Sequence, residues 1–131
     1  MIKYKINFRV KPKELAALRN SVGWNGMESS YKKSLKKSFL NISCFDDAEF
    51  VGFIDVISNG VSDAYLQDLV VRPDHQGRGI GTTLVSMAIE LLSKKGVYAV
   101  SVLFQEDLLP FYKKFNFNIM MAGQLETRKE D

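Results

Sequence analysis

Three alternating glycines stand where an apolar strand gives way to an amphipathic helix, in Gln76-Gly77-Arg78-Gly79-Ile80-Gly81-Thr82. Glycine lets the backbone approach a ligand closely, and the first N–H groups of a helix have no partner inside it. Such a turn binds phosphate or pyrophosphate through main-chain donors. The sequence therefore predicts an anion site for a phosphorylated cofactor. The Thr82 hydroxyl would add one hydrogen bond, and Arg78 would either add positive charge or face solvent.

The spacing of the glycines separates this turn from two familiar phosphate-binding motifs. A P-loop places a lysine directly before the Ser or Thr of the helix start, and Thr82-Thr83 has none. A dinucleotide fingerprint has the spacing G-x-G-x-x-G near the first strand, whereas this motif is G-x-G-x-G and lies late in the chain. An ordinary glycine-rich connection between a strand and a helix remains an alternative.

The pattern Gln-x-x-Gly-x-Gly at 76–81 resembles the acyl-CoA-binding motif of the GNAT superfamily of N-acetyltransferases. Residues 66–73 (LQDLVVRP) resemble the fourth strand of that family, and 108–117 (LLPFYKKFNF) resemble its final helix and the following turn. The resemblance extends from the first strand to Met121, although residues 1–60 match only in the order of elements. It implies an α/β (α+β) fold in which about four helices flank a mixed, mostly antiparallel sheet with one splayed parallel strand pair.

The resemblance also implies how acetyl-CoA would bind as a co-substrate. Backbone N–H groups of the glycine turn would hold the pyrophosphate, and the pantetheine arm would lie between strands 64–71 and 97–104. A backbone N–H near Leu69 or Val70 would polarise the thioester carbonyl. Gln105 stands where the family often has an asparagine that contacts pantetheine. The expected cofactor-binding residues are Leu69, Val70, Val71, Gln76, Gly77, Arg78, Gly79, Ile80, Gly81, Thr82 and Gln105.

The expected reaction is direct attack of a neutral amine on the thioester in a ternary complex. An alkylamine has a pKa of about 10, so a proton must leave before the attack. Asp68 is the first candidate to receive it and Asp55 the second, while a structural hydrogen bond is the alternative for each. By family resemblance, Tyr112 would protonate the departing thiolate, and packing against the sheet is its alternative role.

The acceptor site is expected near the first helices. Trp24, Met27 and Tyr31 would form an aromatic-rich wall, or all three would belong to the core. The predicted acceptor is the primary amine of a small molecule. A protein lysine or N-terminal amine is the alternative, and a CoA-binding regulatory module without catalysis is the alternative from another class.

The hydrophobic pattern predicts the elements that position these residues. The expected strands cover 2–8, 38–45, 50–58, 64–71 and 97–104, with a last strand over 117–121. One expected helix starts at Pro12, and three further helices are expected over 27–37, 79–94 and 107–115. Asn59-Gly60 predicts a hairpin turn. The apolar run at 97–104 predicts a buried strand, parallel to 64–71 through a helical crossover.

Length, composition and charge limit the number of domains and the kinds of partner that we expect. A length of 131 residues with 46% hydrophobic and 25% charged residues predicts one globular domain over 1–131. A net charge of +3 is too small to indicate nucleic-acid binding. A single cysteine, Cys44, and the lack of a signal or membrane-spanning run favour a reducing cytoplasm. His75 is the only histidine, so no metal site is expected, and it is expected to be an exposed loop residue. The resemblance to the GNAT superfamily suggests a homodimer.

Overall fold

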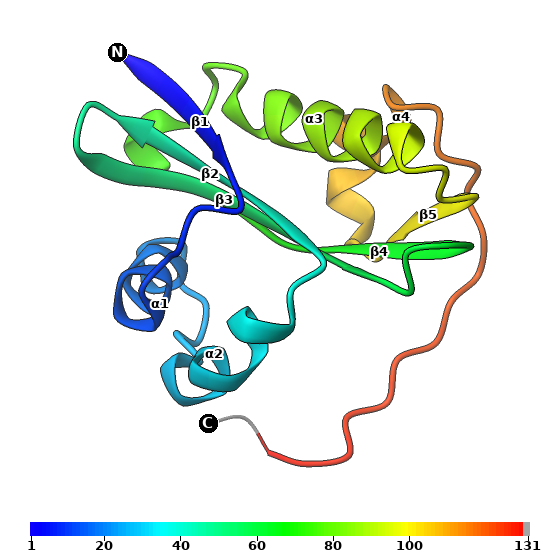
Figure 1. The fold of residues 1–131 in the computed structure, drawn as a ribbon, viewed down its shortest axis with the longest axis horizontal. Helices are drawn as coiled ribbons and strands as arrows, with labels where there is room; N and C mark the ends of the chain where they lie inside the picture. Colours follow the sequence, from blue (N-terminus) through cyan, green and yellow to red (C-terminus); the bar gives the residue numbers. More distant parts are fainter. Residues whose placement is uncertain (130–131) are drawn as a thin grey trace.

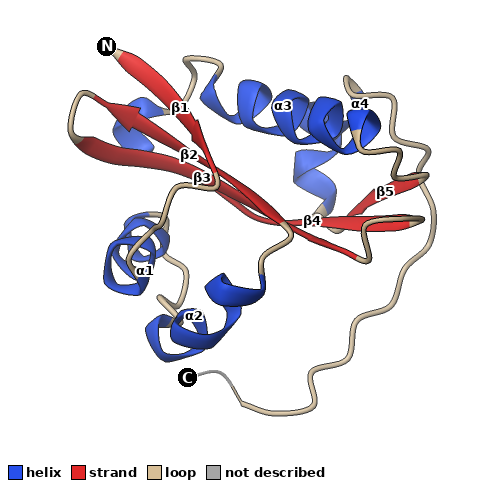
Figure 2. Cartoon of the chain, viewed as in Figure 1, coloured by secondary structure: helices blue, strands red, loops and turns tan. Residues whose placement is uncertain are grey.

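One mixed sheet, in the order β1-β2-β3-β4-β5, runs through the computed structural model, which describes residues 1–129 (Figures 1 and 2). Its strands are β1 (Ile2–Ile6), β2 (Leu40–Asp46), β3 (Glu49–Ser58), β4 (Asp63–Val71) and β5 (Ala99–Val102). The helices of the described residues are α1 (Pro12–Ser21), α2 (Glu28–Ser34), α3 (Ile80–Lys94) and α4 (Leu109–Lys113). Single 3-10 turns cover Leu35–Lys37, Pro73–His75 and Glu106–Leu108. The first four strands pair antiparallel and β4–β5 pair parallel, which confirms the predicted fold class.

Helices cover both faces of the sheet. Figure 2 shows α3 along one face and α1 and α2 on the other. Gly52 lets α3 approach β3, because a Cβ at this position would lie 3.2 Å from Ile80 Cγ2. On the opposite face, Phe53 is fully buried in a cluster with Leu15 of α1 and Tyr31 of α2. The sheet is therefore a layer between two helical layers, with an apolar cluster on each of its faces.

The β4–turn–α3 segment agrees closely with its prediction. Helix α3 begins at Ile80, one residue after the predicted start, and buries a stripe that includes Leu84, Ala88 and Leu92. It ends at Lys94, and Gly96 follows with φ 78, a left-handed conformation that glycine adopts without strain. The glycine turn is thus fixed between a paired strand and a long packed helix.

Strands β4 and β5 separate after a short stretch of pairing. Their parallel register joins Asp63–Leu66 to Ala99–Val102, and β4 then continues to Val71 paired with β3 but not with β5. A bulge adds to the opening, because Asp68 and Leu69 stand where β3 has only Ile54. Backbone groups of β4 beyond Leu66 therefore have no strand partner on this side. This splay confirms the expected arrangement of the two strands.

The predicted strand over 117–121 is wrong for this chain. Residues 117–129 form no strand or helix, and the orange-to-red segment in Figure 1 runs past β5 towards α2. A strand needs a partner, and no backbone hydrogen bond joins 117–129 to the sheet of the described chain. The apolar run at 119–122 alone therefore did not decide the structure of this segment.

Several predicted boundaries also shift. The first strand ends at Ile6, because Asn7 turns the chain with φ 55. The predicted helix 27–37 divides into α2 and the 3-10 turn at 35–37, and the helix 107–115 narrows to α4 after its own 3-10 turn. Strand 97–104 shortens to β5. Among residues 1–129, every helix is too short or too polar to cross a bilayer.

Candidate active site

A cavity of about 1980 Å³ opens where β4 and β5 diverge. Its walls come from β4, the turn at 75–82, β5, α4 and the segment 116–124. Of the predicted cofactor-binding residues, all line this cavity except Arg78, which is exposed outside it. Tyr112, Asp68 and Trp24 line the same space. Tertiary structure thus gathers most of the candidate site around one opening.

The glycine turn presents unpaired backbone donors to this cavity. Gly77 and Gly79 adopt φ 77 and φ 81, and no side chain caps α3 at Gly79. In the described chain, no backbone carbonyl accepts from the N–H groups of residues 77–82. Gln76 Nε2 donates to Val71 O at 2.9 Å and so fixes the turn to the end of β4. The arrangement can bind an anion through several N–H groups and the positive end of the helix dipole.

A lysine that the sequence analysis did not consider stands beside this turn. Lys114 Nζ donates to Thr82 Oγ1 at 2.6 Å, and it lies 4.5 Å from the centre of the Phe111 ring. The ammonium group therefore adds positive charge to the first turn of α3. The signal that could have found Lys114 is its place in the 108–117 motif, which folds back onto the helix start.

Tyr112 of α4 lines the opening. Its ring is stacked on Phe104, with centroids 4.5 Å apart, and only 5% of the residue is exposed. Burial raises the pKa of the Tyr112 phenol to about 12. The phenol is therefore protonated at neutral pH and can act as a proton donor. Asn116 takes φ 67 after this helix, a left-handed conformation that asparagine tolerates.

Asp68 is held by an arginine from α1. Arg19 Nη1 donates to Asp68 Oδ1 at 2.8 Å and to Tyr31 Oη at 3.1 Å. Arg19 Nε donates to Asn25 O at 2.7 Å, and the guanidinium lies 5.1 Å from the Trp24 ring centre. Arg19 therefore joins α1, its following loop, α2 and β4. No local pattern in the sequence links Arg19 to Asp68, because 49 positions separate them.

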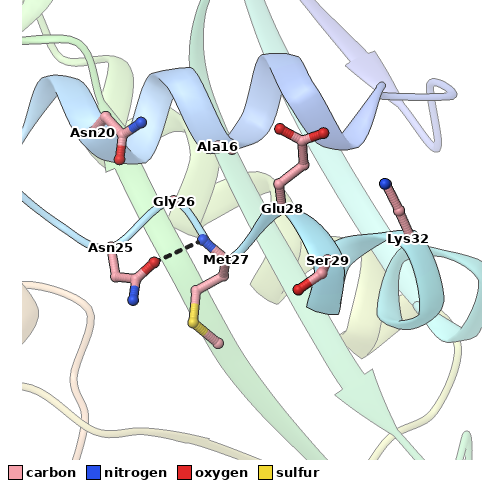
Figure 3. A pocket seen from close by; sticks show the side chains of 8 residues that line it. All are labelled: Ala16, Asn20, Asn25, Gly26, Met27, Glu28, Ser29 and Lys32. Atoms are coloured by element: carbon pink, nitrogen blue, oxygen red, sulfur yellow. Dashed lines mark hydrogen bonds between the residues drawn. The ribbon is translucent and has the colours of Figure 1, made fainter. Parts of the chain in front are cut away.

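The three predicted acceptor residues occupy different places. Trp24 is 43% exposed and lines the large cavity. Met27 lines a separate hollow of about 550 Å³ between α1 and α2. Its N–H donates to Asn25 Oδ1 at 3.1 Å, the hydrogen bond drawn in Figure 3. Tyr31 is buried, and burial raises the pKa of its phenol. Of the three, only Trp24 belongs to the cavity that contains Tyr112.

Asp55 is a buried carboxylate next to the cavity, not within it. It is 3% exposed, accepts a hydrogen bond from Ser38 Oγ, and accepts another from Gln67 Nε2 at 3.0 Å. Burial raises the pKa of the Asp55 carboxyl. Gln67 lines the cavity and Asp55 does not, so Gln67 connects Asp55 to the cavity through this hydrogen bond.

The expectation that His75 is an exposed loop residue is wrong. Its side chain is buried between two carboxylates, with Nε2 2.8 Å from Asp46 Oδ2 and Nδ1 2.7 Å from Asp74 Oδ1. Asp46, and to a lesser degree Asp74, raise the pKa of the imidazole. Asp46 belongs to β2, so this contact was not visible in the sequence. His75 ties the start of the glycine turn to the other half of the sheet.

This contact predicts a pH dependence of stability. A raised pKa in the folded state means that the stabilising contribution is complete below the ordinary histidine pKa of about 6.5 and is lost as pH rises through the raised value. We expect the free energy of unfolding, measured by urea denaturation from pH 6 to pH 9, to fall with pH. The variant His75→Gln should lack this decline. The same slope in both proteins would contradict the assignment.

Comparison with known proteins agrees with this geometry. Residues 12–117 match the model of the Acetyltransferase (GNAT) family, and the chain belongs to that family. It is 32% identical over 111 residues to an uncharacterized N-acetyltransferase, ycf52, of Pyropia yezoensis, covering 79% of this chain and 63% of that protein. The chain thus spans less than two thirds of that relative.

Solved structures show the same fold. A GNAT family acetyltransferase from Streptococcus pneumoniae TIGR4 is 27% identical with a TM-score of 0.84, covering 99% of this chain and 100% of that one. A probable acetyltransferase from methicillin-resistant Staphylococcus aureus has a TM-score of 0.89 at 19% identity, covering 98% and 100%. The arrangement of sheet and helices is therefore that of the family.

Proposed function

We propose that this protein transfers an acetyl group from acetyl-CoA to the primary amine of a small molecule. The observation that carries the proposal is the splay of β4 from β5, with unpaired N–H groups of the glycine turn at one end and Asp68 at the other. Tyr112 lies on the wall of the same cavity. A cofactor bound at the turn would direct its thioester towards Tyr112 and Asp68.

The cofactor would bind by its phosphates and by its arm. The N–H groups of Gly77 to Thr82 would donate to the pyrophosphate of CoA. The amides of the pantetheine arm would pair with Leu69 and Val71, because β4 has no strand partner there on the side of β5. Gln105, which also lines the cavity, would contact the arm from the β5 side.

The reaction would form a C–N bond and break a C–S bond. The neutral amine attacks the thioester carbon, and a backbone N–H near Leu69 or Val70 stabilises the oxyanion of the tetrahedral intermediate. The intermediate collapses with loss of the CoA thiolate, which takes a proton from Tyr112. The proton lost by the substrate ammonium passes to Asp68 or to solvent.

The charges of the cavity are consistent with these partners. The turn end combines free N–H groups with Lys114 and suits a polyanion. The opposite end holds the amide of Gln67 and the Asp68 carboxylate, of which one oxygen accepts from Arg19 and the other would accept from an ammonium group. Trp24 supplies an apolar surface for the body of the acceptor.

A panel of amines tests the proposal. The purified chain is incubated with acetyl-CoA and each amine, and free thiol is followed over time against a control without amine. The panel contains aliphatic, aromatic and sugar amines, together with peptides that carry a free lysine or N-terminus. We expect amine-dependent thiol release with a small amine. Turnover with peptides alone would indicate a protein acetyltransferase, and CoA binding without turnover on any amine would indicate a non-catalytic module.

A further inference from the structure

A row of polar side chains crosses the sheet from β2 to β4 and ends at the cavity. Asn41 stands opposite Asp55 in the register of β2 and β3, and Asp55 stands opposite Gln67 in the register of β3 and β4. Asn41 and Asp55 are 9% and 3% exposed, whereas Gln67 lines the cavity. Burying a carboxylate is unfavourable unless its oxygens accept hydrogen bonds, so the donors around Asp55 determine what this row can do.

Both carboxylate oxygens of Asp55 accept hydrogen bonds from side chains. Ser38 Oγ donates to Oδ1, and Gln67 Nε2 donates to Oδ2 at 3.0 Å. Asn41 Nδ2 donates to Ser38 Oγ at 3.2 Å, which leaves the hydroxyl proton of Ser38 for Asp55. Asp55 therefore binds β4 through the NH₂ end of the Gln67 amide.

This contact determines which end of the Gln67 amide is left for the cavity. A primary amide has a donor end and an acceptor end, and a carboxylate oxygen binds the donor end. With Nε2 held by Asp55, the carbonyl oxygen Oε1 remains, and no group of residues 1–129 donates to it. Without Asp55, rotation about the last side-chain bond would exchange the two ends, because that torsion has two similar minima.

The bulge in β4 brings the next residue to the same cavity. Neighbouring residues of a regular strand point to opposite faces, but Asp68 has φ 57 and lies in the bulge. Gln67 and Asp68 consequently both line the cavity. Arg19 Nη1 donates to Asp68 Oδ1, and Asp68 Oδ2 would accept from a substrate. An ammonium group carries three donors and no acceptor, so two oxygens suit it and an amide NH₂ group does not.

We infer that Asp55 is a positioning residue, which holds the Gln67 amide with its carbonyl oxygen towards the amine of the acceptor. The inference rests on the proposed function, which supplies that amine. Gln67 Oε1 and Asp68 Oδ2 hold the amine together before it attacks the thioester. Asp55 contacts no substrate and acts only through Gln67.

Kinetics with the best amine of the panel provide the first test. The amide of Asp55→Asn can donate to Gln67 as well as accept from it, so the Gln67 amide should turn. We expect KM for the amine to rise by about tenfold or more, while the Kd of acetyl-CoA stays within about threefold. Ser38→Ala removes the other side-chain hydrogen bond of Asp55 and should keep KM within about threefold. An unchanged KM in Asp55→Asn, or an equal rise in Ser38→Ala, would overturn the inference.

The reversed pair separates orientation from packing. In the double variant Asp55→Asn with Gln67→Glu, the new amide at position 55 donates to the new carboxylate at position 67. The second oxygen of that carboxylate again faces the cavity, and the volume and formal charge of the pair are nearly unchanged. We expect KM for the amine to return to within about threefold of the unmodified chain. A KM as high as that of Asp55→Asn alone would argue against the role of Asp55.

A titration that needs no turnover distinguishes this inference from the proposed function. The side-chain amide resonance of Gln67 is followed by NMR in the ¹⁵N-labelled chain as n-butylammonium chloride is added, with sodium chloride as the matched salt. We expect a saturable shift in the unmodified chain, with an apparent affinity about tenfold lower or less in Asp55→Asn. The same shift with both salts would refute the inference. A shift specific to butylammonium without turnover on any amine would refute acetyl transfer and still support the role of Asp55.

Discussion

Tyr112→Phe is expected to lower kcat for acetyl transfer by about 100-fold or more, while the Kd of acetyl-CoA changes by less than about threefold. The substitution removes the hydroxyl that would protonate the CoA thiolate and keeps the ring that packs on Phe104. Removing a positioned proton donor costs about 10² to 10⁴ in rate, whereas the apolar contacts survive. Steady-state thiol release measures kcat, and calorimetry on the same preparation measures the Kd of acetyl-CoA.

A matched tyrosine controls this result. Tyr65 lines the same cavity, and Tyr65→Phe removes the same atom from a residue of β4. We expect it to retain most of its activity. Because the pKa of Tyr112 is about 12, kcat of the unmodified protein should not fall between pH 8 and pH 10 through loss of this acid. Full activity in Tyr112→Phe would assign Tyr112 to packing alone.

Gly79→Val is expected to weaken acetyl-CoA binding by about tenfold or more. Gly79 caps α3 at φ 81, and a residue with a Cβ pays about 1–2 kcal/mol in this conformation, with a β-branched side chain at the upper end. The turn would relieve this strain by moving its backbone N–H donors away from the pyrophosphate. A loss of about 1.4 kcal/mol of binding free energy raises Kd tenfold, which calorimetry measures.

Gly96 offers the matched control at the other end of α3. It has φ 78, and neither Gly96 nor Gly79 has another atom within 4 Å of an added Cβ. Gly96→Val should therefore lower the free energy of unfolding by a similar amount and leave the Kd of acetyl-CoA unchanged. Equal losses of affinity in both variants would mean that strain in α3, and not the turn, governs binding.

The fold was predictable to the extent that its signals are local. The order of strands and helices through Lys94 follows from apolar periodicity and from the glycine stops, because each element reports its own buried face. The segment 117–121 shows the limit of this reasoning. Its composition favours a strand, but pairing depends on a partner edge, which no local pattern describes.

The candidate site also combines features that local sequence predicts with contacts that only the folded chain shows. By itself, the sequence determined the glycine turn between β4 and α3 and predicted that it binds an anion, because the glycines and the helix start are neighbours in the chain. It also indicated Tyr112 through the 108–117 motif. Only the tertiary structure decided that Arg19 holds Asp68, that Asp46 holds His75, and that Lys114 reaches Thr82. These contacts join residues 29 to 49 positions apart, and such distances close only when the sheet and its helices pack together.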